Sequence, residues 1–520
     1  MLRRSRSALA AAIALLVVSG TLLAIGLLSH PLPGPAAPRT GPYPVLDSSS
    51  PPQPVGSTTV IGVVATPTVG YFPTALLEDP RTGWIYVANE ISSNVTVLNG
   101  TLSIGNVPVG TGPSGLAYDD ANGEVYVTNE NASTVTIIDF TTAVATVSVG
   151  LSPVSPVYDA ADGYVYVPDY ASSSVTILEN RSVIANLTVG AAPTSAVYDP
   201  ADGYVYVTSE QSGLEAILSG TTLLESLPIH LSDAFDTVYD PFSGVVYVIN
   251  GTSQIAKFGG PGTGYACLIS GLTLLRSVDI GPGPGYGAVA AVDPVNGWLY
   301  VPDGTTDVVT VVNGSSVVGI VPVGATPEFA QFDPANGFVL VADQLGDTVT
   351  VMNGSTVAAN PPVGTYPYAL TYDPLNRLMY VGNLGSSTVS AIGNVSGFLV
   401  TFEETGLRSG TSWSVTFQGV GRSSVGSTID FYEPNGSYAY LVNSVPGYTT
   451  ESATSGIQLV DPSGAVVSVS FLAVTPPSPP PPPFPWTTVL VGIGVAAVAL
   501  VAVWAVFRGR SQRNERIGRI

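Results

Sequence analysis

A fourteen-residue phrase that returns at a fixed distance constrains this chain more than any other feature. It reads "VYDAADGYVYVPDY" at residues 157–170 and "VYDPADGYVYVTSE" at residues 197–210. Its aspartate recurs at intervals of 40, 40, 40, 41, 53, 40 and 40 residues, as Asp79, Asp119, Asp159, Asp199, Asp240, Asp293, Asp333 and Asp373. A period near 40 with four strand-like runs is typical of β-propeller blades. The sequence therefore predicts an all-β propeller of eight repeats over residues 58–396.

One period shows how the strands arise. In residues 194–231, "TSAVY", "YVYVT", "LEAIL" and "LLESLPIHL" are rich in β-branched, aromatic and aliphatic residues, and turn residues separate them. In the turn "DPADG", Asp199 can accept a bond from the backbone two residues on, Pro200 presets φ, and Gly203 tolerates positive φ. We therefore expect the repeat aspartates to be structural. Only the eighth copy, "DPLNRLMYV", has Arg377 where the others have glycine.

The last period lacks a fourth strand, and the chain has a spare one at its start. "GVVATPTVG" at residues 62–70 matches "AVATVSVG" at residues 143–150, which ends a complete period. We therefore expect the N-terminal strand to complete the blade that contains Asp373 and to close the ring.

The terminal segments resemble export and membrane-anchoring sequences. Residues 1–29 combine "MLRRSRS" with an uncharged run from Ala8 to Leu28, so we expect a cleaved signal peptide or a retained N-terminal anchor. The uncharged residues 487–507 are long enough to cross a bilayer, and the basic tail 508–520 follows them. These patterns predict a single-pass protein of the cell membrane, with the propeller outside the cell.

Three further segments lie between these ends and the propeller. Residues 30–57 form a Pro- and Ser-rich linker, and "TPPSPPPPPFPW" at residues 475–486 predicts a polyproline stalk. Residues 397–474 alternate strand-like runs with the turns "EPNGS" and "DPSG", which predicts a small β-sandwich.

Candidates for catalysis are few. The two histidines are His30, in a linker, and His230, in a strand-like run, so no Ser-His-Asp or Cys-His arrangement can be assigned. Cys267, the single cysteine, lies in "GGPGTGYACLISG", which we interpret as a longer hairpin, with a ligand-contacting loop as the alternative. "GPGPGYG" at residues 281–287 lacks the Lys-Ser/Thr of a phosphate loop. We predict no catalytic residue, no metal ligand and no cofactor.

Two other sets of residues recur with the repeat. Asp169, Asp303 and Asp343 share a register position with Asn89, Asn129 and Asn383; we expect them to cap turns, and a structural calcium ion is the alternative. Ten asparagines precede Ser or Thr by two residues, and we expect some to carry glycans: Asn94, Asn99, Asn131, Asn180, Asn186, Asn250, Asn313, Asn353, Asn394 and Asn435.

The net charge of the chain predicts how its stability depends on pH. Between Thr40 and Trp486 the chain has seven basic and 36 acidic residues, a net charge of −29. We expect mutual repulsion to raise many carboxylate pKa values, and backbone hydrogen bonds to lower those of the turn aspartates. The part outside the membrane should then be most stable at roughly pH 4 to 5.

The motif "YVTNE" at residues 126–130, with "YVANE", "YVPDY" and "YVTSE" in register, resembles the YVTN β-propeller repeat of archaeal surface-layer and other cell-surface proteins. The resemblance covers residues 58 to about 394. The familiar rings of this family have seven blades, so a ring of seven blades is the alternative to a ring of eight. The resemblance implies a surface location and a binding or structural role, and it brings no catalytic residues. "FEETGLRSGTSWSVTFQG" is similar to small extracellular modules that occur beside such propellers in archaea.

Two classes of function follow. We expect a non-enzymatic, membrane-anchored binding or adhesion scaffold whose partners are envelope components, glycans or other surface proteins, and not nucleic acid. The alternative is a surface enzyme of the propeller lactonase type, which would need metal-binding side chains clustered on one face of the ring.

Overall fold

The computed structural model describes residues 58–229, 234–251, 263–282, 288–474, 496–506 and 508. The predicted signal segment, both linkers and the basic tail beyond Arg508 lie outside these residues. Of the predicted membrane segment, residues 496–506 are described and are helical and exposed. In the part of the chain that the structure describes, no helix is long and apolar enough to span a bilayer.

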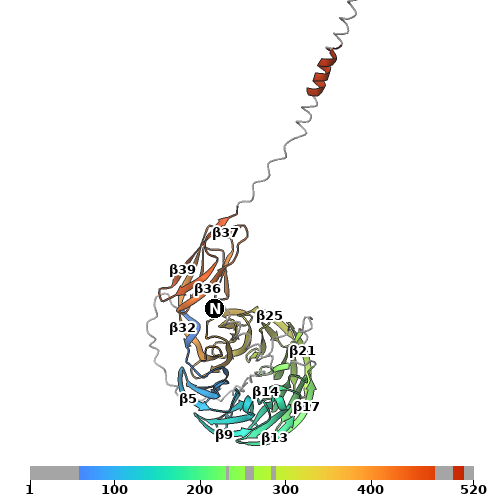
Figure 1. Ribbon diagram of the computed structural model, residues 1–520, viewed down its shortest axis with the longest axis vertical. Coiled ribbons are helices and arrows are strands. Elements are labelled where there is room, and N and C mark those ends of the chain that lie inside the picture. Colours follow the sequence, from blue (N-terminus) through green and yellow to red (C-terminus); the bar gives the residue numbers. More distant parts are fainter. Residues whose placement is uncertain are drawn as a thin grey trace, which may run out of the picture.

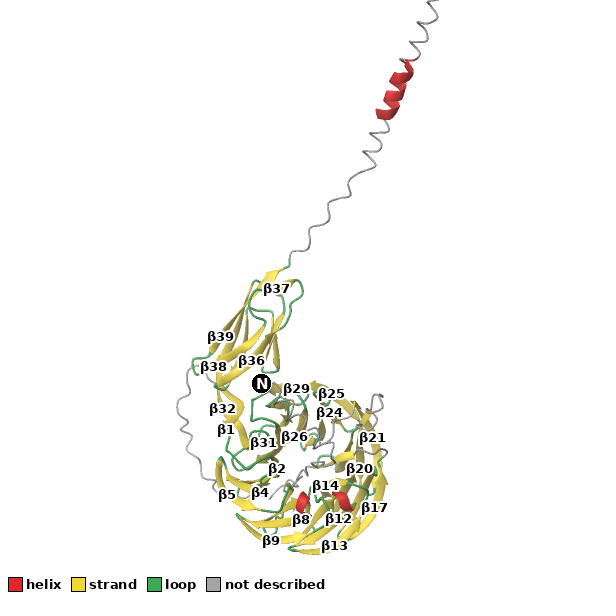
Figure 2. Ribbon diagram, in the orientation of Figure 1, coloured by secondary structure: helices red, strands yellow, loops and turns green. Residues whose placement is uncertain are grey.

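The fold is all-β, with four-stranded antiparallel sheets repeated around a ring (Figures 1 and 2). We call these sheets blades 1 to 8 in chain order. Their first strands are β2 (Pro73–Asp79), β6 (Pro113–Tyr118), β10 (Val157–Asp159), β14 (Pro193–Asp199), β18 (Ala234–Asp240), β22 (Ala291–Asp293), β26 (Pro327–Asp333) and β30 (Pro367–Asp373). Their second strands are β3 (Trp84–Asn89), β7 (Glu124–Asn129), β11 (Tyr164–Asp169), β15 (Tyr204–Ser209), β19 (Val245–Asn250), β23 (Trp298–Asp303), β27 (Phe338–Asp343) and β31 (Leu378–Asn383).

The two outer strands of each blade follow the same plan. The third strands are β4 (Asn94–Asn99), β8 (Thr134–Asp139), β12 (Ser174–Glu179), β16 (Leu214–Ser219), β20 (Thr263–Ser270), β24 (Val308–Asn313), β28 (Thr348–Asn353) and β32 (Thr388–Thr405). The fourth strands are β5 (Leu102–Pro108), β9 (Thr142–Ser148), β13 (Ser182–Thr188), β17 (Thr222–Pro228), β21 (Thr273–Pro282), β25 (Ser316–Pro322), β29 (Thr356–Ala359) and, for blade 8, β1 (Thr58–Ala65).

The ring is closed by strand β1, as the sequence predicts. β1 pairs antiparallel with β32, with Ala65 opposite Ala391 and Val63 opposite Ile392. The register, including the bulge between these two pairs, equals that of β9 on β8 in blade 2. First strands contact one another around the whole ring, from β2 through β30 and back to β2. The described part of the ring therefore contains eight blades rather than seven.

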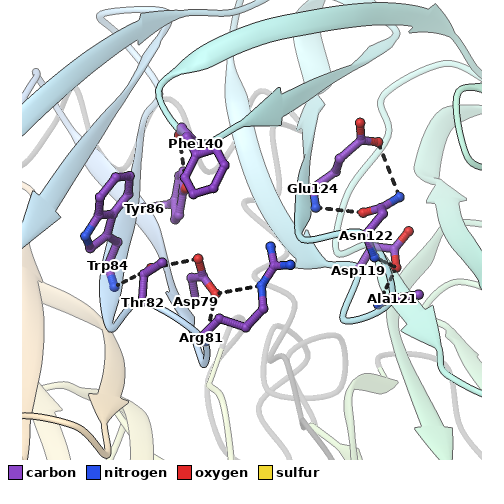
Figure 3. Close-up of polar contacts among 10 residues, drawn as sticks. All are labelled: Asp79, Arg81, Thr82, Trp84, Tyr86, Asp119, Ala121, Asn122, Glu124 and Phe140. Atoms are coloured by element: carbon purple, nitrogen blue, oxygen red, sulfur yellow. Dashed lines mark hydrogen bonds and ion pairs between the residues drawn. The ribbon is translucent and has the colours of Figure 1, made fainter.

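Every repeat aspartate holds the turn between the first and second strands. Its Oδ1 accepts the N–H of the residue two positions on, at 2.7–3.0 Å in all eight blades. The residue four positions on then takes positive φ, which explains the recurring glycine. Arg377 takes the same conformation, with a φ of 59°. Figure 3 shows these turns in blades 1 and 2, at Asp79 and Asp119.

The tyrosine of the repeated phrase links neighbouring blades. The hydroxyl of Tyr86 in blade 1 donates to the carbonyl of Phe140, in the last turn of blade 2, at 2.9 Å (Figure 3). Tyr126 and Tyr166 make the same contact with Asn180 and Gly220, each 54 residues further on. Buried apolar side chains fill the space between adjacent blades, and all three tyrosine rings are fully buried. The repeated phrase therefore encodes shape: a turn, a buried strand and a latch to the next blade.

A second domain grows out of blade 8 without a linker. β32 continues past the propeller and pairs with β35 (Thr428–Glu433) and with β39 (Ala465–Ala473), which in turn pairs with β37 (Tyr448–Thr450). β34 (Val420–Ser424), β33 (Trp413–Phe417), β36 (Gly436–Val442) and β38 (Ser455–Val460) form the second sheet. The core between the sheets is aromatic, with Phe402, Phe417 and Phe431 in edge-to-face or tilted contact. The predicted boundary at residues 396 and 397 thus falls inside one strand.

Candidate binding site on the crossover face

The two faces of the ring carry different turns. Because strands alternate in direction within a blade, the aspartate turns and the hairpins between third and fourth strands share one face, the Asp-turn face. The hairpins between second and third strands and the crossings to the next blade share the opposite face, the crossover face. The described arginines in propeller turns, Arg81, Arg181 and Arg377, all belong to the Asp-turn face. Arg81 and Arg181 make the ion pairs of the described residues, with Asp79 and Glu124.

At the crossover face, the register position of Asn89 and Asp169 ends the second strand and is buried. The prediction that these residues cap turns is confirmed for Asp303, whose Oδ1 accepts the N–H of Thr305 at 2.9 Å. It is wrong for the other members of the set, because their side chains bind hydroxyls of the third strand. Asp169 Oδ2 accepts from Ser174 at 3.1 Å and from Thr176 at 2.7 Å, and Asn129 Nδ2 donates to Thr136 at 2.9 Å. These hydrogen bonds hold the second and third strands of a blade together. Within the described ranges, no three His, Cys, Asp or Glu side chains are arranged to hold a metal ion.

In blades 1 to 4, the next residue supplies an acidic group or a tyrosine. Glu90, Glu130, Tyr170 and Glu210 occupy this position in blades 1 to 4. The backbone N–H of each donates to a carbonyl in the crossing loop of the same blade, at 2.8–3.0 Å, so all four take the same place in their blades. The Tyr170 hydroxyl also donates to Glu210 Oε2 at 3.1 Å.

Blades 7 and 8 add two more residues to this end of the ring. Glu328 and Tyr368 are the second residues of β26 and β30, so they lie where the innermost strands begin. First strands surround the axis of the ring, so both residues belong to the innermost strands, and Tyr368 is close to Glu328 and Glu90. We call Glu90, Glu130, Tyr170, Glu210, Glu328 and Tyr368 the axial cluster.

Three carboxyl groups of the axial cluster, the buried Glu130 and the half-buried Glu90 and Glu328, have no cation among the groups that shift their pKa values. Burial, with a smaller contribution from Glu90, raises the pKa of Glu130 to about 7. Burial, with help from Asp303, raises the pKa of Glu328 to about 8, and burial alone raises the pKa of Glu90. The Tyr368 hydroxyl is close enough to Glu328 and Glu90 for both to add to the upward shift of its pKa. These groups therefore share one electrostatic environment that lacks positive charge.

No basic side chain in the described part of the chain pairs with Glu90, Glu130 or Glu328. Arg276 lies on the outer strand β21, and Arg408 and Arg422 belong to the second domain. Lys257 lies outside the described residues. Oε2 of Glu90 is buried without a hydrogen bond, and Glu130 is only 9% exposed. An incoming ammonium or guanidinium group would supply the missing positive charge and hydrogen-bond donors.

The other predicted residues are not part of this cluster. Cys267 is buried on strand β20, which forms with β21 a longer hairpin than its counterparts, as the sequence predicts, and not a ligand-contacting loop at this residue. Its Sγ lies 3.3 Å from Ser277 Oγ. His30, His230 and most of the Gly-rich run 281–287 lie outside the described residues. Of the ten sequon asparagines, Asn250 is buried and Asn94 is half-buried, whereas the other eight are exposed.

Sequence reasoning missed the axial cluster, although a signal existed. The glutamate of "YVANE", "YVTNE" and "YVTSE" recurs in register as Glu90, Glu130 and Glu210. Only the closed ring shows that these positions surround one axis together with Glu328, which comes from a different part of the repeat.

The topology alone defines this chain as a β-propeller protein. No family model matches it, and no curated protein matches it in sequence. Among solved structures it is similar to hydrazine synthase of Kuenenia stuttgartiensis, at 16% identity and a TM-score of 0.46, over 62% of this chain and 96% of that one. It is also similar to virginiamycin B lyase of Staphylococcus aureus, at 8% identity and a TM-score of 0.44, over 65% and 100% of the two chains.

A third similar structure is that of the dihydro-heme d1 dehydrogenase NirN, at 15% identity and a TM-score of 0.49, over 64% of this chain and 76% of that chain. These distant similarities concern the propeller fold and not an activity.

Proposed function

We propose that this protein is a non-enzymatic, membrane-anchored surface scaffold of the YVTN type that binds a cationic partner through the axial cluster. The observation that carries the proposal is that no described cation lies beside Glu90, Glu130 or Glu328 at the crossover face. Four glutamates gather around the axis on the crossover face, whereas the described arginines in propeller turns lie on the Asp-turn face. A rigid ring that presents buried, unneutralised carboxylates is suited to recognition of ammonium or guanidinium groups.

The chemistry of the cluster narrows the class of partner. Tyr170 and Tyr368 stand among the glutamates, and tyrosine rings attract organic cations through their π-electrons. Acidic and aromatic side chains together favour an amine-bearing envelope component, such as a lysine-rich surface protein or an aminated glycan. The apolar ends of the chain support a surface location, with residues 487–507 as the anchor and residues 508–520 inside the cell.

Binding of spermidine to the full-length protein tests the cluster. We expect the double variant Glu130→Gln/Glu328→Gln to weaken binding about tenfold or more at low salt, because two charge-assisted contacts are lost. The matched control is Glu179→Gln/Glu225→Gln, which removes the same charge from exposed positions on β12 and β17. Isothermal titration calorimetry measures both. Equal weakening by the two double variants would show that net charge, and not the axial cluster, attracts the amine.

The proposed topology has its own test. Protease added to intact cells should remove the propeller and leave a short membrane-bound fragment that contains residues 508–520, because the arginine-rich tail stays inside. An epitope tag after Ile520 reports the fragment by immunoblot. A propeller that is cut only after lysis would overturn the surface location without affecting the amine-binding result.

A further inference from the structure

The eight blades provide an internal comparison, because each buried position has a counterpart in seven other blades. One such position is the third-strand residue that pairs with the penultimate residue of the second strand. It is fully buried in every blade. Blade 4 has Glu215 there, whereas the counterparts are all apolar: Val95, Val135, Val175, Ala266, Val309, Val349 and Val389. The propeller therefore does not need a carboxyl group at this position in order to fold.

A second residue that departs from the repeat pattern is Asp236, which lies close to Glu215 across the interface of blades 4 and 5. Asp236, in the first strand of blade 5, lies four residues before the turn aspartate and is 1% exposed. Its counterparts are uncharged: Ala75, Gly115, Ser155, Ser195, Val289, Phe329 and Ala369. Two buried carboxyl groups at positions that are otherwise uncharged, in adjacent blades, indicate a feature specific to this interface.

Hydroxyl groups connect the two carboxyl groups. Asp236 Oδ1 accepts from Ser195 Oγ at 3.3 Å, and its Oδ2 accepts the backbone N–H of Ala290 at 2.9 Å. Ser195 pairs with Thr208 across β14 and β15, and Thr208 Oγ1 donates to Glu215 Oε2 at 2.7 Å. The result is a row of oxygens from Asp236 through Ser195 and Thr208 to Glu215.

One oxygen of this row lacks a hydrogen-bond partner. Oε1 of Glu215 is fully buried and has no hydrogen-bond partner. The described residues form no ion pair with either carboxyl group, and an unpaired buried carboxylate is unfavourable. Burial and the neighbouring Asp236 raise the pKa of Glu215 to about 8, and burial raises the pKa of Asp236 to about 7. A small cation would neutralise both groups and satisfy the free oxygen.

We propose that Glu215 and Asp236, with the hydroxyls of Ser195 and Thr208, form a buried site for a hard divalent cation of the Ca²⁺ type that joins blades 4 and 5. The donors are all oxygens, which Ca²⁺ prefers over nitrogen or sulfur. The site uses two carboxylates and shares no residue with the axial cluster, so variants can test it separately from the proposed amine binding.

Calorimetric melting of the full-length protein tests this site. At about pH 7.5, saturating Ca²⁺ should raise the Tm of the wild type above its value in chelator by about 2–5 °C. Glu215→Val, which installs the residue of six other blades, and Asp236→Ser, which installs that of blade 4, should abolish the rise. Titration calorimetry should show one high-affinity Ca²⁺ site lost in both. Glu130→Gln/Glu328→Gln should keep the rise, which separates this site from the axial cluster.

Two outcomes would overturn the proposal. One is a Ca²⁺-dependent rise that Glu215→Val and Asp236→Ser leave intact. The other outcome has two parts. The wild type neither binds Ca²⁺ nor gains Tm when Ca²⁺ is added. In chelator, Glu215→Val has a higher Tm than the wild type at about pH 7.5 but not at about pH 5. The two carboxyl groups would then be neutralised by protonation and not by a metal ion. Should Glu215→Val fail to fold, the near-isosteric Glu215→Gln serves the same comparison.

Discussion

Deletion of residues 58–70 should convert a cooperatively folding protein into one that aggregates or melts at least about 10 °C lower. β1 is the fourth strand of blade 8, and its loss would expose the edge of β32 from Thr388 to Gly397. Unpaired strand edges associate with other chains. Ile61, Val63 and Val69 also pack against the core that joins blades 7, 8 and 1, and that contact would be lost. Size-exclusion chromatography and calorimetry measure the two effects.

The matched control is deletion of residues 30–57, which removes the preceding linker and leaves β1 in place. A synthetic peptide of residues 58–70, added in trans, should partly restore the melting temperature by adding the missing strand. If the protein without residues 58–70 stays monomeric and melts at the wild-type temperature, β1 does not close the ring in solution.

The second large effect is a loss of stability as pH rises from about 4 to about 8. Burial raises many carboxyl pKa values, to about 8 for Glu78, about 7 for Glu433 and about 7 for Asp343. A group whose pKa is higher in the folded state binds more protons there than in the unfolded chain. Folding is therefore favoured below the unfolded values near 4 and is progressively disfavoured up to the folded values. We expect the Tm to be on the order of 10 °C lower at pH 8 than at pH 5.

The structure changes the reason for this prediction. Repulsion among surface carboxylates was the expected cause, but burial is the largest cause for the shifted groups in the ring. The expectation that turn aspartates have lowered pKa values is also wrong for Asp119, Asp159, Asp199, Asp333 and Asp373, whose pKa values burial raises despite their backbone hydrogen bonds. In the second domain, by contrast, hydrogen bonds from Ser463 lower the pKa of Asp461.

Because burial is the cause, salt should change the pH dependence little. Melts from pH 3 to 8 at low and high ionic strength separate the two causes, since surface repulsion is screened and desolvation is not. Glu78→Gln should flatten the profile between about pH 5 and 8, and the exposed Glu225→Gln is its control. A Tm that is highest at pH 7 or above would contradict the prediction under either cause.

Glu78 illustrates why the sequence could not anticipate this. Tyrosine precedes the repeat aspartate in several blades, and Tyr118, Tyr158 and Tyr198 lie close enough to the turn aspartate of the preceding blade for it to help raise their pKa values. Glu78 takes the corresponding position in blade 1 and lies beside Asp373 of blade 8. The juxtaposition exists only because the ring closes between residues almost 300 positions apart in the chain.

The sequence by itself determined the local elements and their order. Turn chemistry and strand propensity act over a few residues, so the 40-residue period, the aspartate turns and the match of residues 62–70 to a fourth strand could be read directly. The tertiary structure decided the number of blades in the closed ring, the shared axis of Glu90, Glu130 and Glu328, and the meeting of Glu215 with Asp236. These depend on which strands become neighbours and on how much water burial removes, and neither is a property of a short stretch of chain.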